Sequence, residues 1–312
     1  CPDHGCFYIS GYGDIRSYHT GYDSYERKEA WKEMSFFEDS VFFGMIVSVA
    51  TYGLGSLLHK KFKLAIFNPL LISVILVIVI LAVSHIDYDV YNPETDEFIY
   101  KKYSVEDMKG KAFNKKCLQK DMGLSVRADV PLIGMVTRLV KHKGIDLVKC
   151  VFEDMLQGDV QFVILGSGEW EFETFFYEMH NRYPDKVGLK LGFDQNLAHK
   201  IYAGSDIFLM PSKSEPCGLA QMVALRYGTI PIVRKTGGLN DTITDSGDGV
   251  GNGFTFENYN AHDMQNAVWR AVQGYGDKKG FEIMRKRAME CNNSWAASAN
   301  AYIRLYKEIL GK

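Results

Sequence analysis

The chain has 312 residues, enough for about two domains, and its content of 46% hydrophobic and 24% charged residues is ordinary for a globular protein. A net charge of −2 excludes proteins that bind nucleic acid through strong positive charge. Six cysteines without framework spacing indicate reduced thiols of an intracellular protein. Cys1, His4 and Cys6 have no second ligand pair, so we expect no metal site.

The first third of the chain changes character twice. Residues 1–33 are rich in Tyr, Gly and charge, show no period and remain an unassigned leader. Phe42–Leu58 and Leu64–Ser84 are apolar runs separated by a basic loop, and the second carries no charge over 21 residues. About 20 apolar residues suffice to cross a bilayer. The runs therefore predict a transmembrane helical hairpin over residues 34–85, with a buried hairpin in a folded core as the alternative.

This hairpin resembles the start of the LrgB family of bacterial membrane proteins, which is linked to holin-like control of murein hydrolases. The resemblance rests on Phe43-Gly44, Lys60-Lys61 and Asn68-Pro69-Leu70-Leu71 and runs to about Asn92. It implies membrane association through residues 42–84. The lysines of the short loop should stay on the cytoplasmic side, which would place both ends of the hairpin outside.

From residue 86 onward, helical and strand-like runs alternate. Crossover helices between buried strands predict an α/β fold, a doubly wound parallel sheet of six strands that forms one nucleotide-binding type of domain over residues 86–312. The expected strands are 130–136, 160–165, 187–192, 206–210, 229–233 and 253–256, and the expected helices are 144–156, 169–183, 196–203, 220–227, 261–273 and one that starts at Ser294.

Two motifs follow the fourth and fifth expected strands. The first is Glu215-Pro216-Cys217-Gly218-Leu219, with Pro216 at the expected first position of a helix, and the second is Thr236-Gly237-Gly238-Leu239. Ligands of open α/β sheets bind at the carboxyl ends of the strands, where glycines permit close approach to a phosphate. The motifs therefore predict a diphosphate site with a carboxylate beside it. Taken singly, Glu215 could be only a helix-dipole partner and the glycine pair only a turn.

The first expected strand is followed by a pair of cations. Arg138 lies two residues after its end, and Lys143 precedes Gly144, which opens a helix. Fixed cations can neutralise the charge that builds up on a leaving phosphate, although loop cations are usually only solvated. After the second strand, Gly166 and Gly168 form another loop suited to close approach.

In this order, the motifs closely resemble the bacterial glycogen synthase and plant starch synthase family, from about Ile86 to the end of the chain. The matching residues are Thr137-Arg138-Leu139, Lys143-Gly144, Leu165-Gly166-Ser167-Gly168, Gly192-Phe193, Ala203-Gly204-Ser205-Asp206, Pro211-Ser212, Glu215–Leu219, Arg226-Tyr227-Gly228-Thr229, Thr236–Leu239, Asp241-Thr242 and Ser294-Trp295.

The resemblance implies a GT-B glycosyltransferase that moves glucose from ADP-glucose to the non-reducing end of an α-1,4-glucan such as glycogen, with retention and with neither metal nor cofactor. Arg138 and Lys143 would hold the distal phosphate, and Glu215 would bind the glucose hydroxyls and stabilise the positive sugar. The nucleotide-sugar would also meet Gly166, Gly168, Phe193 (stacked on adenine), Cys217, Gly218, Leu219, Thr236, Gly237, Gly238 and Leu239. Val223 stands eight residues after Glu215, so the two-glutamate pattern of other GT-B families is absent.

One departure from the family is large. Its first domain carries a Lys-x-Gly-Gly-Leu loop and the acceptor site, and no such loop occurs ahead of residue 86 in this sequence. The chain therefore resembles a donor-binding half joined to a membrane fragment, as in a chimera, and we expect weak nucleotide binding and little turnover. We expect a cytoplasmic glycosyltransferase domain, membrane-associated if the hairpin inserts. The alternatives are an LrgB-like membrane fragment and a nucleotide-binding module without catalysis.

Overall fold

In a computed structural model of the chain, the described residues are 41–62, 68–83 and 91–310. The chain divides into two compact units with the boundary between Tyr88 and Asp89, and each unit is described by itself. The expected leader, residues 1–33, lies outside the described residues, as does most of the segment that joins the two resemblances.

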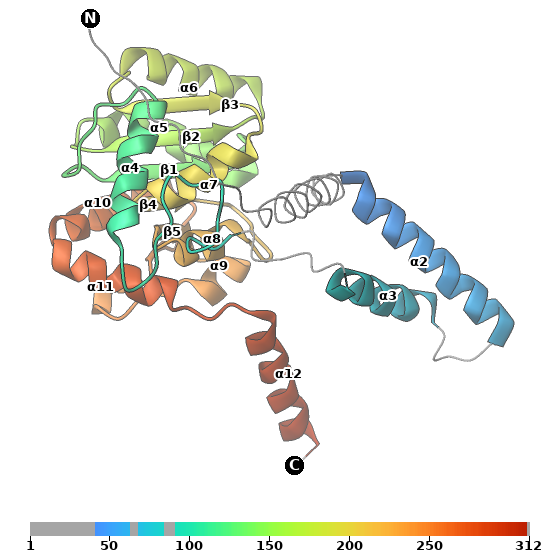
Figure 1. Cartoon of the computed structure of the whole chain (residues 1–312). Coiled ribbons are helices and arrows are strands. Elements are labelled where there is room, and N and C mark those ends of the chain that lie inside the picture. Colours follow the sequence, from blue (N-terminus) through green and yellow to red (C-terminus); the bar gives the residue numbers. More distant parts are fainter. Residues whose placement is uncertain (1–40, 63–67, 84–90, 311–312) are drawn as a thin grey trace, which may run out of the picture. The chain divides into compact units, whose positions relative to one another are not determined.

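The first unit contains two helices, α2 (Val41–Phe62) and α3 (Pro69–Val83), shown in blue and teal in Figure 1. Thr51 Oγ1 lies 3.0 Å from Ser73 Oγ in a buried hydrogen bond between the helices. A Cβ atom added to Gly55 would lie 2.8 Å from the carbonyl oxygen of Pro69. A glycine at this position therefore lets the start of α3 approach α2 closely.

The predicted membrane spans are not supported by these helices. Helix α3 has 15 residues, a length of about 22 Å, whereas the hydrocarbon core of a bilayer is about 30 Å thick. Helix α2 is longer but ends in His59, Lys60 and Lys61. Within the described ranges, no helix combines the length and the apolar character that crossing a membrane requires. Residues 64–67 and Ser84 of the expected second span lie outside those ranges.

The second unit is built on a six-stranded parallel sheet in the order β3-β2-β1-β4-β5-β6. The strands are β1 (Leu132–Val136), β2 (Gln161–Gly166), β3 (Val187–Leu191), β4 (Ile207–Met210), β5 (Ile230–Arg234) and β6 (Phe254–Phe256). Strands β2 and β3 are added one after another on one side of β1. The chain then crosses back, and β4 to β6 are added one after another on the other side of β1. The predicted doubly wound parallel sheet is thus confirmed, and each strand lies within two residues of its expected bounds.

Helices cover both faces of this sheet (Figure 1). Side chains alternate along each strand, so that Ile133 and Met135 of β1 enter one hydrophobic cluster while Leu132 enters the other. The first cluster also takes side chains of α5 (Ile145–Leu156), α6 (Trp170–Arg182), α10 (Ala261–Gly276) and α11 (Lys278–Met289), and the second takes side chains of α4 (Lys109–Asp121), α7 (Gln195–Gly204) and α8 (Ala220–Arg226). The remaining elements of the sheet unit are the short helix α9 (Gly237–Thr242), the 3-10 turns Lys141–Lys143 and Ser246–Asp248, and α12 (Trp295–Ile309).

Three details differ from the sequence-based expectations. Helix α8 begins at Ala220, so the prediction that a helix starts at Pro216 is wrong, and residues 215–219 form a loop. Helices α4 and α11 are not predicted by hydrophobic periodicity. The buried face of α4 explains the omission, because it includes Lys111, Asn114 and Lys115 instead of a run of apolar residues.

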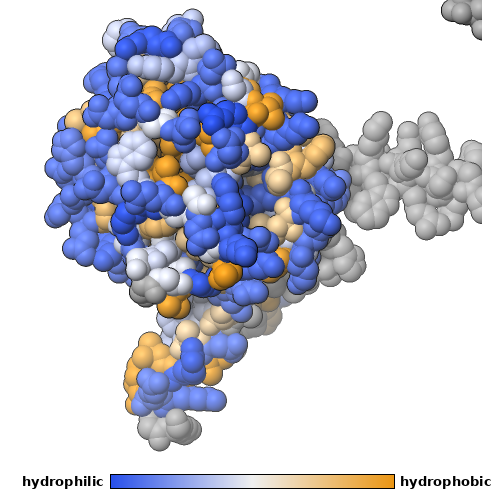
Figure 2. Space-filling model, turned by 90° about the vertical axis from the view of Figure 1, so that its left-hand side faces the viewer, coloured by the Kyte–Doolittle hydropathy of each residue, from blue (hydrophilic) through white to orange (hydrophobic). Residues whose placement is uncertain are grey.

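Several large apolar side chains of the last helix of the sheet unit are exposed. The face of the sheet unit seen in Figure 2 is mostly hydrophilic, with small scattered hydrophobic patches. Helix α12 begins as predicted, with Ser294 Oγ accepting a hydrogen bond from Ala297 N. The side chains of Tyr302 and Tyr306, which are four residues apart on one face of α12, are 62% and 60% exposed. This face is therefore not packed into the core of the unit.

Candidate active site

A cleft opens where the order of the strands reverses, at the carboxyl ends of β1 and β4. Its volume is about 240 Å³, and it is lined by the residues after both strands. The two strands are neighbours in the sheet although about 70 residues separate them, so the loops that follow them meet. Open α/β sheets bind ligands at this topological switch point. The polar lining side chains are Thr137, Arg138, Lys143, Ser212 and Glu215.

Lys143 and Glu215 form an ion pair inside this cleft. Lys143 Nζ lies 2.5 Å from Glu215 Oε2, and the two side chains are only 19% and 13% exposed. Ser212 Oγ donates a further hydrogen bond of 3.3 Å to the same carboxylate oxygen. From the sequence, we expected Lys143 after the first strand and Glu215 after the fourth, and did not predict that their side chains are in contact. Their contact puts a cation and a carboxylate side by side in a half-buried site.

The position of Lys143 depends on the glycine that follows it. Gly144 has φ of 80°, a left-handed conformation that other residues rarely adopt. A Cβ atom on Gly144 would lie 2.1 Å from the carbonyl oxygen of Pro211. The loop after β1 therefore packs directly on the loop after β4, and this close packing holds Lys143 beside Glu215.

Arg138 supplies the second cation of the cleft. Its side chain is exposed, lines the cleft and lies with Nη2 3.2 Å from His142 Nε2. In the described part of the chain it makes no ion pair with a carboxylate. A guanidinium with unused donors at the mouth of a cleft suits an anionic ligand such as a phosphate.

The glycines Gly237 and Gly238 bring a third loop against the cleft. A Cβ atom on Gly237, whose φ is 45°, would lie 2.2 Å from Glu215 O, and one on Gly238 would lie 2.0 Å from Cys217 O. Gly238 N donates to Glu215 O at 3.1 Å, and Leu239 N donates to Thr236 O at 3.1 Å. Both amides are thus used inside the protein. In this structure the two glycines allow the backbone of residues 236–239 to pack closely against the loop that carries Glu215.

The predicted glycines after β2 have a similar packing role. Cβ atoms on Gly166 and Gly168 would lie 1.9 Å and 2.1 Å from the carbonyl oxygens of Thr137 and Leu139. Leu139 N also donates to Ser167 O at 2.9 Å. The loop after β2 is therefore fastened to the segment that carries Arg138, without lining the cleft itself.

The remaining predicted residues lie at the exposed rim. Gly218, with φ of 74°, and Leu219, 69% exposed, line the cleft, and Cys217 is an exposed free thiol beside them. Phe193 follows β3 at an outer position of the sheet and is 92% exposed. An aromatic side chain as exposed as this is available to stack on a planar ligand.

Arg234 is a positioning residue that the sequence reasoning missed. It ends β5, and its Nε donates to Ser212 O at 3.2 Å, while Nη2 donates to Lys213 O. Arg234 and Lys213 both lie over the ring of Tyr259, at 5.8 Å and 5.4 Å. Arg234 thereby holds the loop that leads to Glu215. A signal was present, because Arg234 directly follows the expected strand 229–233, much as Arg138 lies two residues after the strand 130–136.

Tyr259 ties the Lys143 loop to the same framework. Its hydroxyl donates to Asp146 Oδ1 at 2.5 Å and lies 3.0 Å from Lys141 O. Burial and the hydrogen bond to Asp146 raise the pKa of Tyr259 above its usual value of 10.0. The hydroxyl therefore stays protonated and remains a donor at neutral pH.

Known proteins match the two parts of the chain separately. Residues 123–288 match the family Glycosyl transferases group 1, and residues 48–100 match the LrgB-like family. Glycogen synthase of Bacillus cereus (strain ATCC 10987 / NRS 248) is 53% identical over 230 residues, 73% of this chain and 48% of the relative. Glycogen synthase of Geobacillus stearothermophilus is 52% identical over 229 residues, which cover 73% of this chain and 47% of the relative. The chain spans about half the length of these curated relatives.

A solved structure gives the same result for the fold. The catalytic domain of starch synthase IV from Arabidopsis thaliana, bound to ADP and acarbose, has a TM-score of 0.66 and 35% identity. The match covers 84% of this chain and 55% of that chain. More than half of the chain matches one family, and the fold and both sets of relatives agree with it. The chain belongs to the group 1 glycosyl transferases.

Proposed function

We propose that residues 86–312 bind ADP-glucose and take part in transferring its glucose to an α-1,4-glucan, with retention. The observation that carries the proposal is the Lys143–Glu215 ion pair in the cleft at the switch point of the sheet. A glycosyl transfer from a nucleotide-sugar separates a positive sugar from a negative diphosphate. A neighbouring cation and carboxylate can stabilise these two charges.

Arg138 and Lys143 are the proposed partners of the leaving diphosphate. Lys143 is a compact charge inside the cleft, whereas Arg138 offers a planar set of donors at the mouth. Lys143 can turn from the carboxylate of Glu215 to a phosphate oxygen, because an ammonium donates three hydrogen bonds. The chain's own cations supply the neutralisation in this proposal, so no metal or cofactor is assigned to the step.

Glu215 is the proposed partner of the glucose. Its carboxylate already accepts from Ser212 and Lys143, which fixes its orientation in the cleft. From there it would accept hydrogen bonds from sugar hydroxyls and stabilise positive charge at the sugar as the bond to phosphate breaks. The proposed role of the 236–239 segment is to complete the diphosphate side of the site, since it is seated on the Glu215 loop.

The nucleotide and the acceptor are assigned from the relatives' names. The starch synthase structure contains ADP and acarbose, and the sequence relatives are glycogen synthases. We propose that Phe193 stacks on adenine and that Cys217, Gly218 and Leu219 line the donor. A glucan is the proposed acceptor.

Calorimetric titration of the whole chain with ADP, ADP-glucose and UDP tests donor binding. We expect saturable binding that prefers the adenine nucleotides, and a dissociation constant about tenfold higher for Arg138→Ala, a loss of about 1.4 kcal/mol. Lys141→Ala is the matched control, because Lys141 is exposed on the same loop and does not line the cleft. Equal affinity for UDP and ADP, or an unchanged constant for Arg138→Ala, would contradict the proposal.

The match of residues 48–100 to the LrgB-like family favours a second, separate function for the first unit. We propose that this unit associates with membrane surfaces, because α2 and α3 expose Val49, Leu57 and Leu70 at 65–67%. Flotation of the whole chain with lipid vesicles tests the idea. Leu57→Ser with Leu70→Ser should reduce the floated fraction, and a chain that never floats would rule it out.

A further inference from the structure

A second cavity lies at the other end of the strands from the cleft, beside the amino ends of β1 and β4. Its volume is about 220 Å³. Asp206, which directly precedes β4, lies in its wall, and Asp206 Oδ2 accepts a hydrogen bond of 2.9 Å from Leu132 N at the start of β1. The cavity shares no lining residue with the cleft that holds Lys143 and Glu215. It is thus a separate feature of the same two strands.

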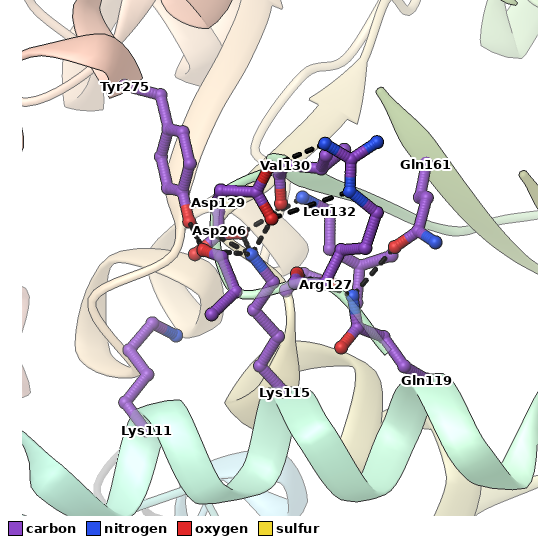
Figure 3. Close-up of polar contacts among 12 residues, drawn as sticks. Lys111, Lys115, Gln119, Arg127, Asp129, Val130, Leu132, Gln161, Asp206 and Tyr275 are labelled. Carbon is purple, nitrogen blue, oxygen red and sulfur yellow. Dashed lines mark hydrogen bonds and ion pairs between the residues drawn. The ribbon is translucent and has the colours of Figure 1, made fainter. Parts of the chain in front are cut away.

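The charges around this cavity are unbalanced. Its lining includes four cationic side chains, those of Lys111, Lys115, Lys116 and Arg285, and the single carboxylate of Asp206. Lys115 Nζ lies 2.7 Å from Asp206 Oδ2, and Arg285 pairs with the other carboxylate oxygen. Figure 3 shows Lys111 and Lys115 extending from α4 toward this group. One carboxylate therefore serves two cations and leaves the others without a countercharge in the wall.

Lys111 is the most deeply buried of these cations. Its Nζ donates to Ala203 O, Tyr227 O and Thr229 Oγ1, all of them neutral acceptors. Burial first, and then the nearby Arg285, lower the pKa of Lys111 well below its usual value. Burial is the main cause of this lowering, and the positive charge of Arg285 adds to it although Asp206 acts in the opposite direction.

Arg285 retains a donor that no described residue satisfies. Its Nη2 is used on Asp206, while its Nε is buried and has no hydrogen-bond partner in the described part of the chain. A buried donor without a partner costs about 1–3 kcal/mol. Asp129 is the other carboxylate near Lys115, but it is 68% exposed and paired with Arg127 at 2.5 Å. It does not supply the missing acceptor.

We propose that this cavity binds a small phosphate-bearing anion, either inorganic phosphate or a small phosphomonoester. A phosphate group would accept from Lys116 and from the Arg285 guanidinium, which both line the cavity, and would balance the excess positive charge of the wall. The volume and the apolar part of the lining, from Met108, Val126 and Tyr275, leave room for a short carbon skeleton. The site lies at the amino ends of the strands whose carboxyl ends carry the proposed donor cleft.

Titration of the whole chain with inorganic phosphate and with glucose 1-phosphate tests this site. The ionic strength is held constant with sodium chloride, and all titrations use the variant Arg138→Ala with Lys143→Ala, which removes the cations of the donor cleft. We expect saturable binding in this background. Tighter binding of glucose 1-phosphate than of inorganic phosphate would indicate that the apolar lining contacts the carbon skeleton. Equal binding of the two would indicate that the site recognises the phosphate group alone.

Two further substitutions in this background locate the binding. Ala112 is exposed and lines the cavity, so Ala112→Glu adds a carboxylate there and should abolish binding. Lys116→Gln should weaken binding about three- to tenfold, because Lys116 is exposed and contributes one charge. Lys120→Gln is the matched control, since Lys120 is an exposed lysine of the same helix outside the cavity, and it should bind as before.

Three results would overturn the proposal. They are the absence of saturable binding in the cleft-variant background, binding that Ala112→Glu leaves unchanged, and equal weakening by Lys116→Gln and Lys120→Gln. Thermal unfolding monitored in parallel reports whether each variant folds, and phosphate should raise the unfolding temperature of every variant that binds it. Because the donor cleft is disabled throughout, failure here leaves the proposal for ADP-glucose untouched.

Discussion

Replacing Glu215 by Gln should tighten the binding of ADP while preventing glucose transfer. In the free protein, Lys143 Nζ is held by Glu215 Oε2 at 2.5 Å. ADP must therefore compete with this carboxylate for the ammonium. Glu215→Gln keeps the shape of the side chain and a neutral acceptor for Lys143 but removes the charge. The ammonium then becomes available to a phosphate oxygen at lower cost.

The expected size of the effect follows from the burial of the pair. Two charges about 4 Å apart at an effective dielectric constant of about 20 attract by about 4 kcal/mol. Desolvation of the two side chains, which are 19% and 13% exposed, offsets most of that attraction. A remaining preference of about 1 kcal/mol corresponds to ADP affinity about fivefold higher in Glu215→Gln.

A double-mutant cycle measured by calorimetry decides whether Lys143 carries the effect. ADP is titrated into the wild-type chain, Glu215→Gln, Lys143→Ala and the double variant, with Glu178→Gln as a control for the loss of one exposed carboxylate. Lys143→Ala alone should weaken ADP binding, and Glu215→Gln should have less than half of its effect in the Lys143→Ala background. Weaker ADP binding by Glu215→Gln, or equal tightening in both backgrounds, would refute the reasoning.

Two further predictions concern a glycine and a partly buried acid. Gly238→Ala places a Cβ atom 2.0 Å from Cys217 O, so we expect about 1–3 kcal/mol lower stability in chemical denaturation and weaker ADP binding, whereas Gly276→Ala, in open space, should change neither. Burial alone raises the pKa of Asp245, but hydrogen bonds from Arg270 and from nearby backbone amides outweigh it and lower the pKa to about 2. The folded-state pKa lies below the unfolded one, so this stabilisation is complete above about pH 4 and is lost as the pH falls through about 2. Asp245→Asn should therefore cost about 1 kcal/mol at pH 7, after allowance for partial exposure, and the difference from wild type should shrink by pH 2.5; a constant difference would contradict the assignment.

Much of the sheet unit could be predicted because its signals are local. Buried parallel strands appear as short apolar runs, and turn residues mark where they end, so the strand that ends at Val136 was found within two residues. Arg138, Glu215 and the glycine pair were singled out because each directly follows such a strand or its loop. In contrast, α4 was not predicted because its buried face contains lysines and amides, whose hydrogen-bond partners, such as Tyr275 and Gln161, come close only in the folded protein.

The membrane prediction shows the limit of counting apolar residues. The run from Leu64 to Ser84 is long enough on paper, but the helix described within it, α3, has 15 residues. Hydropathy reports which residues avoid water, and it does not report where helical hydrogen bonding begins and ends. The LrgB-like match of residues 48–100 supports the resemblance without adding a span.

By itself, the sequence determined the number and order of the strands of the second unit, and the family to which its motifs point, because periodicity, turn chemistry and residue identity are properties of neighbouring residues. Only the tertiary structure decided that Lys143 and Glu215 touch, that Arg234 holds their loop, and that Lys115 and Arg285 share Asp206. These contacts join residues 22 to 91 positions apart. They depend on which strands become neighbours, and the pairing of β4 with β1 is set by the packing of the whole sheet.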